Sequence, residues 1–160
     1  MHKINWKALL ISLAISLGTG GLSAALTAGS MEKYKTMYKP PLAPPGWLFP
    51  IVWTILFILM GVAAYLVYET EADEEDKQNA YIFYGAQLIV NAAWTIIYFR
   101  FQAYIFAFAW LILLWYLILM TIRSFWKINA TAGKLLLPYL LWVTFAAYLN
   151  LAIAIHYWNK

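Results

Sequence analysis

Three side-chain amides lie inside apolar stretches of this sequence, and tryptophan lies close by on the same helical faces. Gln87, Asn91 and Trp94 follow one another at i, i+4 and i+7, and in another stretch Asn150 comes two turns after Trp142. An amide in hydrocarbon is costly unless it is hydrogen-bonded, so these amides should point into a helix bundle. Two interpretations remain open. The amides either join helices to one another or anchor a bound ligand.

The tryptophans on these faces predict an aromatic ligand site. Three of the nine tryptophans lie several residues inside apolar stretches and on the faces that carry polar residues, namely Trp53, Trp94 and Trp142. Small-molecule sites are usually lined by aromatic and apolar side chains with a few polar anchors. We therefore expect a pocket built from these three faces, which also carry Phe57, Asn91, Ala146 and Asn150.

The residue types that support conventional catalysis are scarce. There is no cysteine, and the two histidines, His2 and His156, lie near opposite ends of the chain. No cluster for a metal ion or haem can be assembled, so we expect no metal and no cofactor. A Ser-His-Asp triad and a glycine-rich phosphate loop are also missing, which argues against a hydrolase. No acidic residue falls inside an apolar stretch, which argues against a proton-coupled transporter.

The composition predicts that these residues sit on membrane helices. The chain is 64% hydrophobic and 11% charged, whereas soluble domains carry about 25% charged residues. Apolar runs of bilayer-spanning length are predicted at 8–28, 47–68, 79–99, 103–122 and 135–158. We expect one all-α domain over residues 1–160, an integral membrane bundle of five transmembrane helices. The lysines lie in short connectors, which favours a membrane surface over nucleic acid as the partner.

Two of the predicted helices differ in character. The first repeats a small residue at every fourth position, and such a face allows close helix contact. The stripe consists of Ser12, Ser16, Gly20, Ala24 and Ala28. It should meet another helix, either in the bundle or in a second copy of the chain, and we expect a homodimer. The fourth helix has almost no polar residues, so we expect it to face lipid and contribute little to function.

The connectors carry the remaining signals. Five of the six prolines lie in residues 39–53, and four of them (Pro40, Pro41, Pro44 and Pro45) exclude a helix there. We expect a stiff lid between the first two helices, with Trp53 beneath it; the alternative is a rigid connector without a gating role. Six of the seven acidic residues lie in 69–76, where we expect a solvated loop.

Three motifs, in order, resemble those of one known family. They are "KPPLAPPGWLFPIVWTILFILMGVAAYLVYE" at 39–69, "QLIVNAAWTIIYF" at 87–99 and "LPYLLWVTFAAYLNLAI" at 137–153. The sequence is similar to the translocator protein family, also called tryptophan-rich sensory proteins or peripheral-type benzodiazepine receptors. The resemblance implies a five-helix bundle, often dimeric, that binds porphyrins, sterols and synthetic isoquinoline or benzodiazepine ligands. Bacterial members are reported to bind protoporphyrin IX and to promote its light-dependent breakdown.

The resemblance also implies site residues. The pocket positions carried over are Tyr34, Pro44, Trp53, Asn91, Trp94, Trp142 and Ala146. A sterol motif of the form L/V-x-Y-x-K/R with short gaps is matched by Leu151, Tyr157 and Lys160, a pattern that many helices match by chance.

These observations lead to a primary hypothesis and three alternatives. The chain is expected to be a receptor-like membrane protein for flat apolar ligands, with Trp53 and Trp142 flanking a porphyrin and Asn91 donating a hydrogen bond. Lys33, Lys35 or Lys39 would meet the propionates. The first alternative is an enzyme in which Trp53 and Trp142 support light-dependent porphyrin oxidation. The others are a porphyrin or sterol transporter and an assembly protein. A bacterial plasma membrane is expected, with the mitochondrial outer membrane as the alternative.

Overall fold

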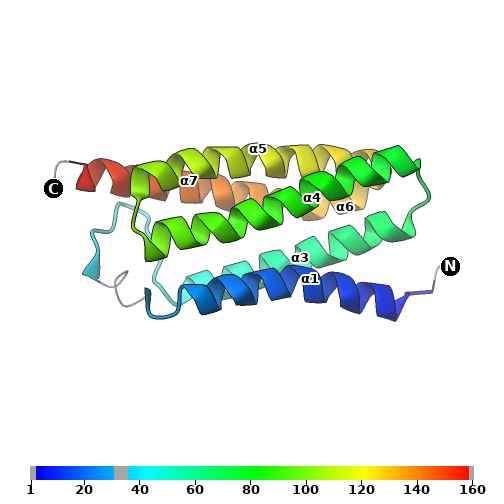
Figure 1. Ribbon diagram of the computed structural model, residues 1–160, viewed down its shortest axis with the longest axis horizontal. Helices are drawn as coiled ribbons and strands as arrows, with labels where there is room; N and C mark the ends of the chain where they lie inside the picture. The colour runs from blue at the N-terminus through cyan, green and yellow to red at the C-terminus, as the bar shows by residue number, and fades with distance from the viewer. Residues whose placement is uncertain (1–2, 31–35, 159–160) are drawn as a thin grey trace.

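The computed structural model describes residues 3–30 and 36–158, and within these ranges the chain is helical with no strand. Five stretches are long and apolar enough to cross a membrane. They comprise α1 (Trp6–Leu26), α3 (Leu48–Glu69), α4 (Glu74–Thr95) continued by the π-helical η1 (Ile96–Arg100), α5 (Tyr104–Ile128), and α6 (Ala130–Leu135) followed by α7 (Leu137–Tyr157). The helices run side by side along one axis (Figure 1). This arrangement confirms the all-α membrane fold.

The acidic connector is shorter than predicted. Glu69 is the last residue of α3 and residues 74–76 form the first turn of α4, so the prediction of a loop over 69–76 is wrong for these four. Carboxylates at a helix N-terminus are stabilised by the positive end of the helix dipole. Asp76 also forms an ion pair with Lys127, whose Nζ lies 3.1 Å from its carboxylate oxygen. The charge that suggested a loop therefore helps to begin a helix.

Two other boundaries differ from the prediction. α5 continues to Ile128, past the predicted end at residue 122. The fifth span consists of two helices, with α6 ending before Leu136 and Pro138 lying in the first turn of α7. Proline is tolerated there because the amides of a first turn have no partner within the helix.

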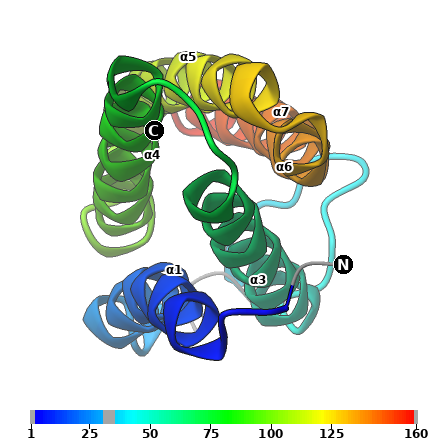
Figure 2. The same ribbon diagram turned by 90° about the vertical axis from the view of Figure 1, so that its right-hand side faces the viewer.

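The fourth span is buried more deeply than predicted. α5 packs against α4 and α7 and buries a full face that includes Leu111, Leu114 and Ile118. The expectation that this helix only faces lipid is therefore wrong. α1 is the most exposed span of the five. Seen from the end, the bundle is a ring in which α1 lies between α3 and α4 (Figure 2).

The small-residue stripe of α1 lies against α3. The Ser12 hydroxyl donates to the Gly61 carbonyl at 2.6 Å, and the Ser16 hydroxyl donates to the Phe57 carbonyl at 2.7 Å. A Cβ on Gly20 would lie 2.6 Å from the Phe57 ring. This part of the stripe thus brings α1 and α3 together within one chain.

Candidate functional site: an aromatic cavity between α1, α3 and α4

A cavity of about 220 Å³ lies where the end of α1 meets the start of α3 and the end of α4. The wall formed by α1 and the residues just after it is made of small residues, including Ala24 and Ala28, which continue the stripe beyond its contact with α3. The opposite walls carry aromatic rings and one amide, namely Phe49, Trp53, Phe57, Asn91, Trp94 and Phe99. The small residues leave the space that the aromatic residues line.

The helical registers of α3 and α4 place the aromatic wall. Trp53 and Phe57 are one turn apart on α3, and their ring centroids are 5.8 Å apart. Asn91 and Trp94 are adjacent on one face of α4, and both are buried. Trp94 also stacks on Tyr98 at 5.3 Å. The structure thus brings Trp53, Phe57, Asn91 and Trp94 to one cavity, as the sequence predicted.

A buried network of polar side chains holds Asn91 in place. The Asn91 amide nitrogen donates to the Tyr139 hydroxyl at 2.6 Å, and that hydroxyl donates to Gln87 Oε1 at 2.7 Å. All three side chains are at most 2% exposed. An amide has two N–H donors, and the bond to Tyr139 uses one of those of Asn91. Tyr139 was not predicted from the sequence, although it lies three residues before Trp142 and therefore on the same helical face.

A second polar contact joins three helices behind the cavity. The Trp94 indole nitrogen donates to Asn150 Oδ1 at 3.1 Å, and Asn150 Nδ2 donates to the Tyr104 carbonyl at 2.8 Å. Of the two interpretations left open for Asn150, the structure supports interhelical hydrogen bonding. Asn150 thereby holds the Trp94 side chain in place.

A smaller chamber of about 30 Å³ lies on the other side of Phe49, Trp94 and Phe99. Ala146 and Asn150 line this chamber and not the main cavity. Lys39 lines it as well. The predicted pocket is therefore divided in two by three aromatic side chains.

Trp142 stands apart from both chambers. Its ring meets the Trp53 ring edge-on, at a centroid distance of 6.5 Å and an interplanar angle of 88°. On its other side it lines a groove between α3 and α7. Because the two indoles touch each other, the expectation that they flank a macrocycle does not match this arrangement. Trp142 packs edge-on against the Trp53 ring.

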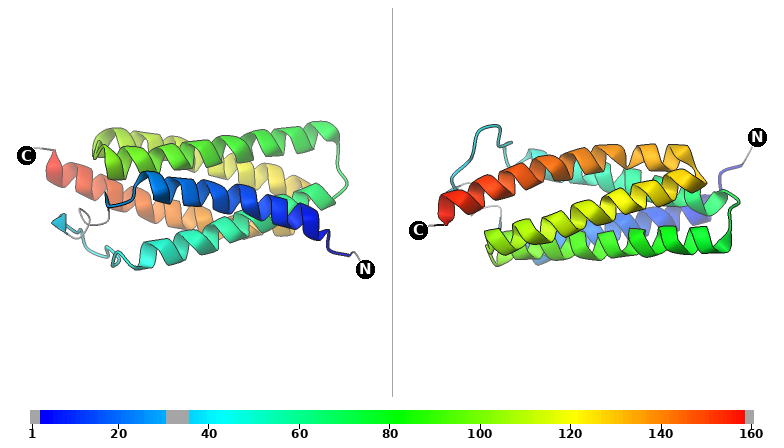
Figure 3. Two further views of the ribbon diagram at one scale, coloured as in Figure 1. Left: turned by 60° about the horizontal axis from the view of Figure 1, so that its bottom comes forward. Right: turned by 90° about the horizontal axis from the view of Figure 1, so that it is seen from above.

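The proline-rich connector is fastened to α7. The Tyr38 amide donates to the Tyr157 hydroxyl at 2.9 Å, and the Tyr148 hydroxyl donates to the Pro41 carbonyl at 2.8 Å. Pro44 is buried in this segment. The connector lies at the end of the bundle where α7 ends (Figure 3). Tyr34, Lys33 and Lys35 lie outside the described residues.

Two residues of the predicted sterol motif lie within the described part of the chain. Leu151 is exposed, the Tyr157 hydroxyl bonds to the connector, and Lys160 lies outside the described residues. Across residues 3–30 and 36–158, no three His, Cys, Asp or Glu side chains come together as metal ligands.

Comparison with known proteins agrees with this architecture. The profile of the TspO/MBR family matches residues 8–156. The chain belongs to the TspO/MBR family. It is 38% identical to the tryptophan-rich protein TspO of Chlorobaculum tepidum over 146 residues, which cover 91% of this chain and 92% of that protein.

Other relatives extend the family to animals. The tryptophan-rich sensory protein of Cereibacter sphaeroides is 34% identical over 98% of this chain and 96% of its own length. The translocator protein of Ovis aries is 32% identical over 73% of this chain and 70% of its own length. TspO/MBR membership and the five apolar helices establish a multi-pass integral membrane protein.

Proposed function

We propose that the chain is a receptor-like membrane protein that binds flat apolar ligands, with porphyrins such as protoporphyrin IX as the main class. The aromatic cavity carries this proposal, because Trp53, Phe57 and Trp94 line it beside one amide, Asn91. Each aromatic contact contributes about 0.5–1.5 kcal/mol beyond area burial. Isoquinoline or benzodiazepine drugs and sterols share this flat, apolar shape.

A porphyrin needs more room than the main cavity offers. Drug-sized ligands occupy pockets of about 300–1,000 Å³, whereas the main cavity measures about 220 Å³. The two chambers are separated only by Phe49, Trp94 and Phe99, and α1 is the least buried span. We propose that the ligand enters by displacing α1, while the connector covers the smaller chamber. Lys39 at that chamber would then meet a propionate.

Titration with protoporphyrin IX in the dark tests this proposal. Purified protein in detergent should show saturable quenching of tryptophan fluorescence, since tryptophans line the site. Quenching that rises linearly, as it would for porphyrin partitioning into micelles, would overturn the proposal.

A second function is favoured by the contact between Trp53 and Trp142. We propose it as an alternative in which light-excited porphyrin is oxidised by dioxygen, with the indoles exchanging electrons with the macrocycle. The excited porphyrin would take an electron from Trp53 and pass it to dioxygen as superoxide. The oxidised indole, which can exchange an electron with Trp142 because the rings are in contact, would then take an electron back from the macrocycle, and the porphyrin radical cation would combine with superoxide. Under illumination, Trp53→Phe and Trp142→Phe should both slow the loss of the porphyrin bands. Trp158→Phe is the control, because Trp158 is exposed at the end of the bundle. Loss of the porphyrin bands at the wild-type rate in all three variants would exclude the mechanism.

A further inference from the structure

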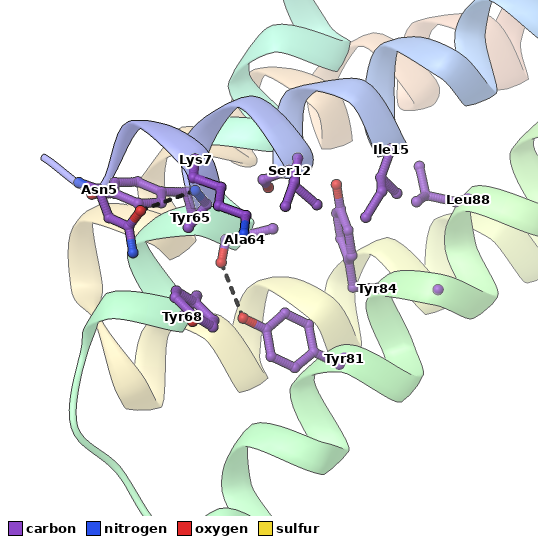
Figure 4. Close-up of a pocket in the computed structure, with 13 residues that line it drawn as sticks. Asn5, Lys7, Ser12, Ile15, Ala64, Tyr65, Tyr68, Tyr81, Tyr84 and Leu88 are labelled. Carbon is purple, nitrogen blue, oxygen red and sulfur yellow. Dashed lines mark hydrogen bonds between the residues drawn. The ribbon is translucent and has the colours of Figure 1, made fainter.

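The largest space between α1 and α4 is not the aromatic cavity. A cavity of about 490 Å³ lies at the opposite end of the bundle, between the first half of α1, the end of α3 and the start of α4 (Figure 4). It shares no lining residue with the aromatic cavity. Neither the sequence motifs nor the proposed function uses it.

The inner part of this cavity is apolar and narrow. Ile11 and Ile15 of α1 face Leu88 of α4 across it. Gly85 has no side chain to fill the cavity on the α4 side. A Cβ at that position would meet nothing within 4 Å, so the space there is open. The cavity is bordered on one side by α1, the least buried of the five spans. An acyl chain has the shape and polarity that this slot fits.

One buried polar group in the wall lacks a partner. The Tyr84 side chain is 6% exposed, and its hydroxyl makes no hydrogen bond to any of the residues that the structure describes. The Ser16 hydroxyl is a neighbour of the Tyr84 hydroxyl, and it donates its own proton to the Phe57 carbonyl. In Figure 4 the Tyr84 hydroxyl points across the cavity toward α1. A buried hydroxyl normally finds a partner, and here a ligand oxygen would supply it.

The mouth of the cavity favours an anion. Lys7 is the single charged side chain among its lining residues, which also include Tyr65 and Tyr68. Acidic residues are present at this end of the bundle, but none lines the cavity. Lysine close to the membrane interface extends its ammonium group toward headgroups. The cavity therefore offers a positive donor at its mouth and a neutral donor further inside.

These two donors are separated along the bundle axis. Lys7 lies five residues before Ser12, which borders the cavity near Tyr84 (Figure 4), and five residues correspond to about 7.5 Å of helix. A free fatty acid has one acceptor group and cannot serve both positions. An anionic glycerophospholipid has a phosphate and, a few bonds further on, an acyl ester carbonyl.

We propose that this cavity binds one acyl chain of an anionic glycerophospholipid. The phosphate pairs with Lys7, the ester carbonyl accepts a hydrogen bond from Tyr84, and the chain lies between Ile15 and Leu88. The site is independent of porphyrin binding, so either proposal can fail without the other.

Native mass spectrometry of the delipidated protein tests the site. Phosphatidylglycerol, phosphatidylcholine and oleate are each added at the same concentration. Phosphatidylglycerol should bind in a one-to-one ratio and in preference to the other two. Equal binding of phosphatidylcholine would contradict the charge argument, and displacement of phosphatidylglycerol by equimolar oleate would overturn the phospholipid assignment in favour of a fatty acid.

Matched variants locate the binding. Gly85→Leu fills the slot and should lower phosphatidylglycerol binding by about tenfold. Gly18→Leu is the control, because a Cβ there also meets nothing within 4 Å and Gly18 does not line the cavity. Tyr84→Phe should weaken binding about fivefold, as expected for one hydrogen bond, and Lys7→Gln should remove the preference over phosphatidylcholine. Wild-type binding in Gly85→Leu would refute the site.

A crosslinking readout separates this site from lipid bound elsewhere on the surface. Phosphatidylglycerol with a diazirine in its acyl chain should label the peptides that contain Ile15 and Leu88. The labelling should disappear in Gly85→Leu and persist in Gly18→Leu. Labelling that is spread evenly over the outer faces of the helices would refute the proposal.

Discussion

Replacing Tyr139 with phenylalanine removes one hydroxyl on which two buried amides depend. In the structure this hydroxyl accepts from Asn91 at 2.6 Å and donates to Gln87 at 2.7 Å. The aromatic ring remains, so packing against Trp53 is retained. The variant therefore isolates the polar contribution of the network.

The magnitude follows from these two hydrogen bonds. Side-chain hydrogen bonds in membrane proteins contribute on average about 0.6 kcal/mol and at most about 1.7 kcal/mol. Two of them give about 1–3 kcal/mol. Gln87 and Asn91 are one turn apart on α4 and can bond to each other in the variant, which places the expected loss in the lower half of this range.

The assay is reversible unfolding in mixed detergent and sodium dodecyl sulfate micelles, followed by the loss of helical circular dichroism. Tyr116→Phe is the matched control, since Tyr116 is 52% exposed on α5, and it should change the free energy of unfolding by less than about 0.5 kcal/mol. Adding Gln87→Leu to Tyr139→Phe should recover part of the loss, because both partners are then apolar. If Tyr139→Phe is as stable as Tyr116→Phe, the network does not stabilise the bundle.

Three further substitutions test the packing. Gly61→Val should destabilise the protein by about 1–3 kcal/mol, because a Cβ at Gly61 would lie 2.8 Å from Ser16 Oγ and 3.0 Å from the Leu13 Cα; an unchanged unfolding midpoint would contradict the close contact of α1 with α3. Gly85→Ala should be neutral or stabilising by up to about 1 kcal/mol, since alanine is the better helix former and has room there; measured destabilisation would mean that the second cavity is filled by protein. Trp94→Phe keeps a ring but removes the hydrogen bond to Asn150, and it should cost about 1 kcal/mol in the same unfolding assay.

The sequence predicted the cavity wall where polar and apolar residues contrast along a helix. Asn91 and Trp94 were identified because amides are rare in apolar stretches, and Trp53 and Phe57 because they repeat one turn apart. The buried face of α5 was missed for the opposite reason. Its buried Leu111 and its exposed Leu113 are chemically alike, and lipid is as apolar as a protein core. Hydropathy cannot tell such faces apart.

The division of the pocket also required three-dimensional information. A helical register shows that Trp142, Ala146 and Asn150 share a face, but not how far the helix is rotated toward its neighbours. In the structure that face is split between the contact with Trp53 and the smaller chamber. Tyr139 was missed because tyrosine is common in membrane helices, and its role depends on two amides that belong to another helix.

The central claim is that flat apolar ligands bind in the cavity beside α1, and protoporphyrin IX titration of two paired variants tests it most directly. Ala24 lines the cavity whereas the exposed neighbouring residue Ala25 does not, so Ala24→Phe fills the cavity and Ala25→Phe adds the same ring outside it. In the dark, the account predicts that Ala24→Phe raises the dissociation constant by about tenfold or more, while Ala25→Phe binds as the wild type does. Equal affinity in the two variants would show that the porphyrin binds elsewhere and would contradict the account.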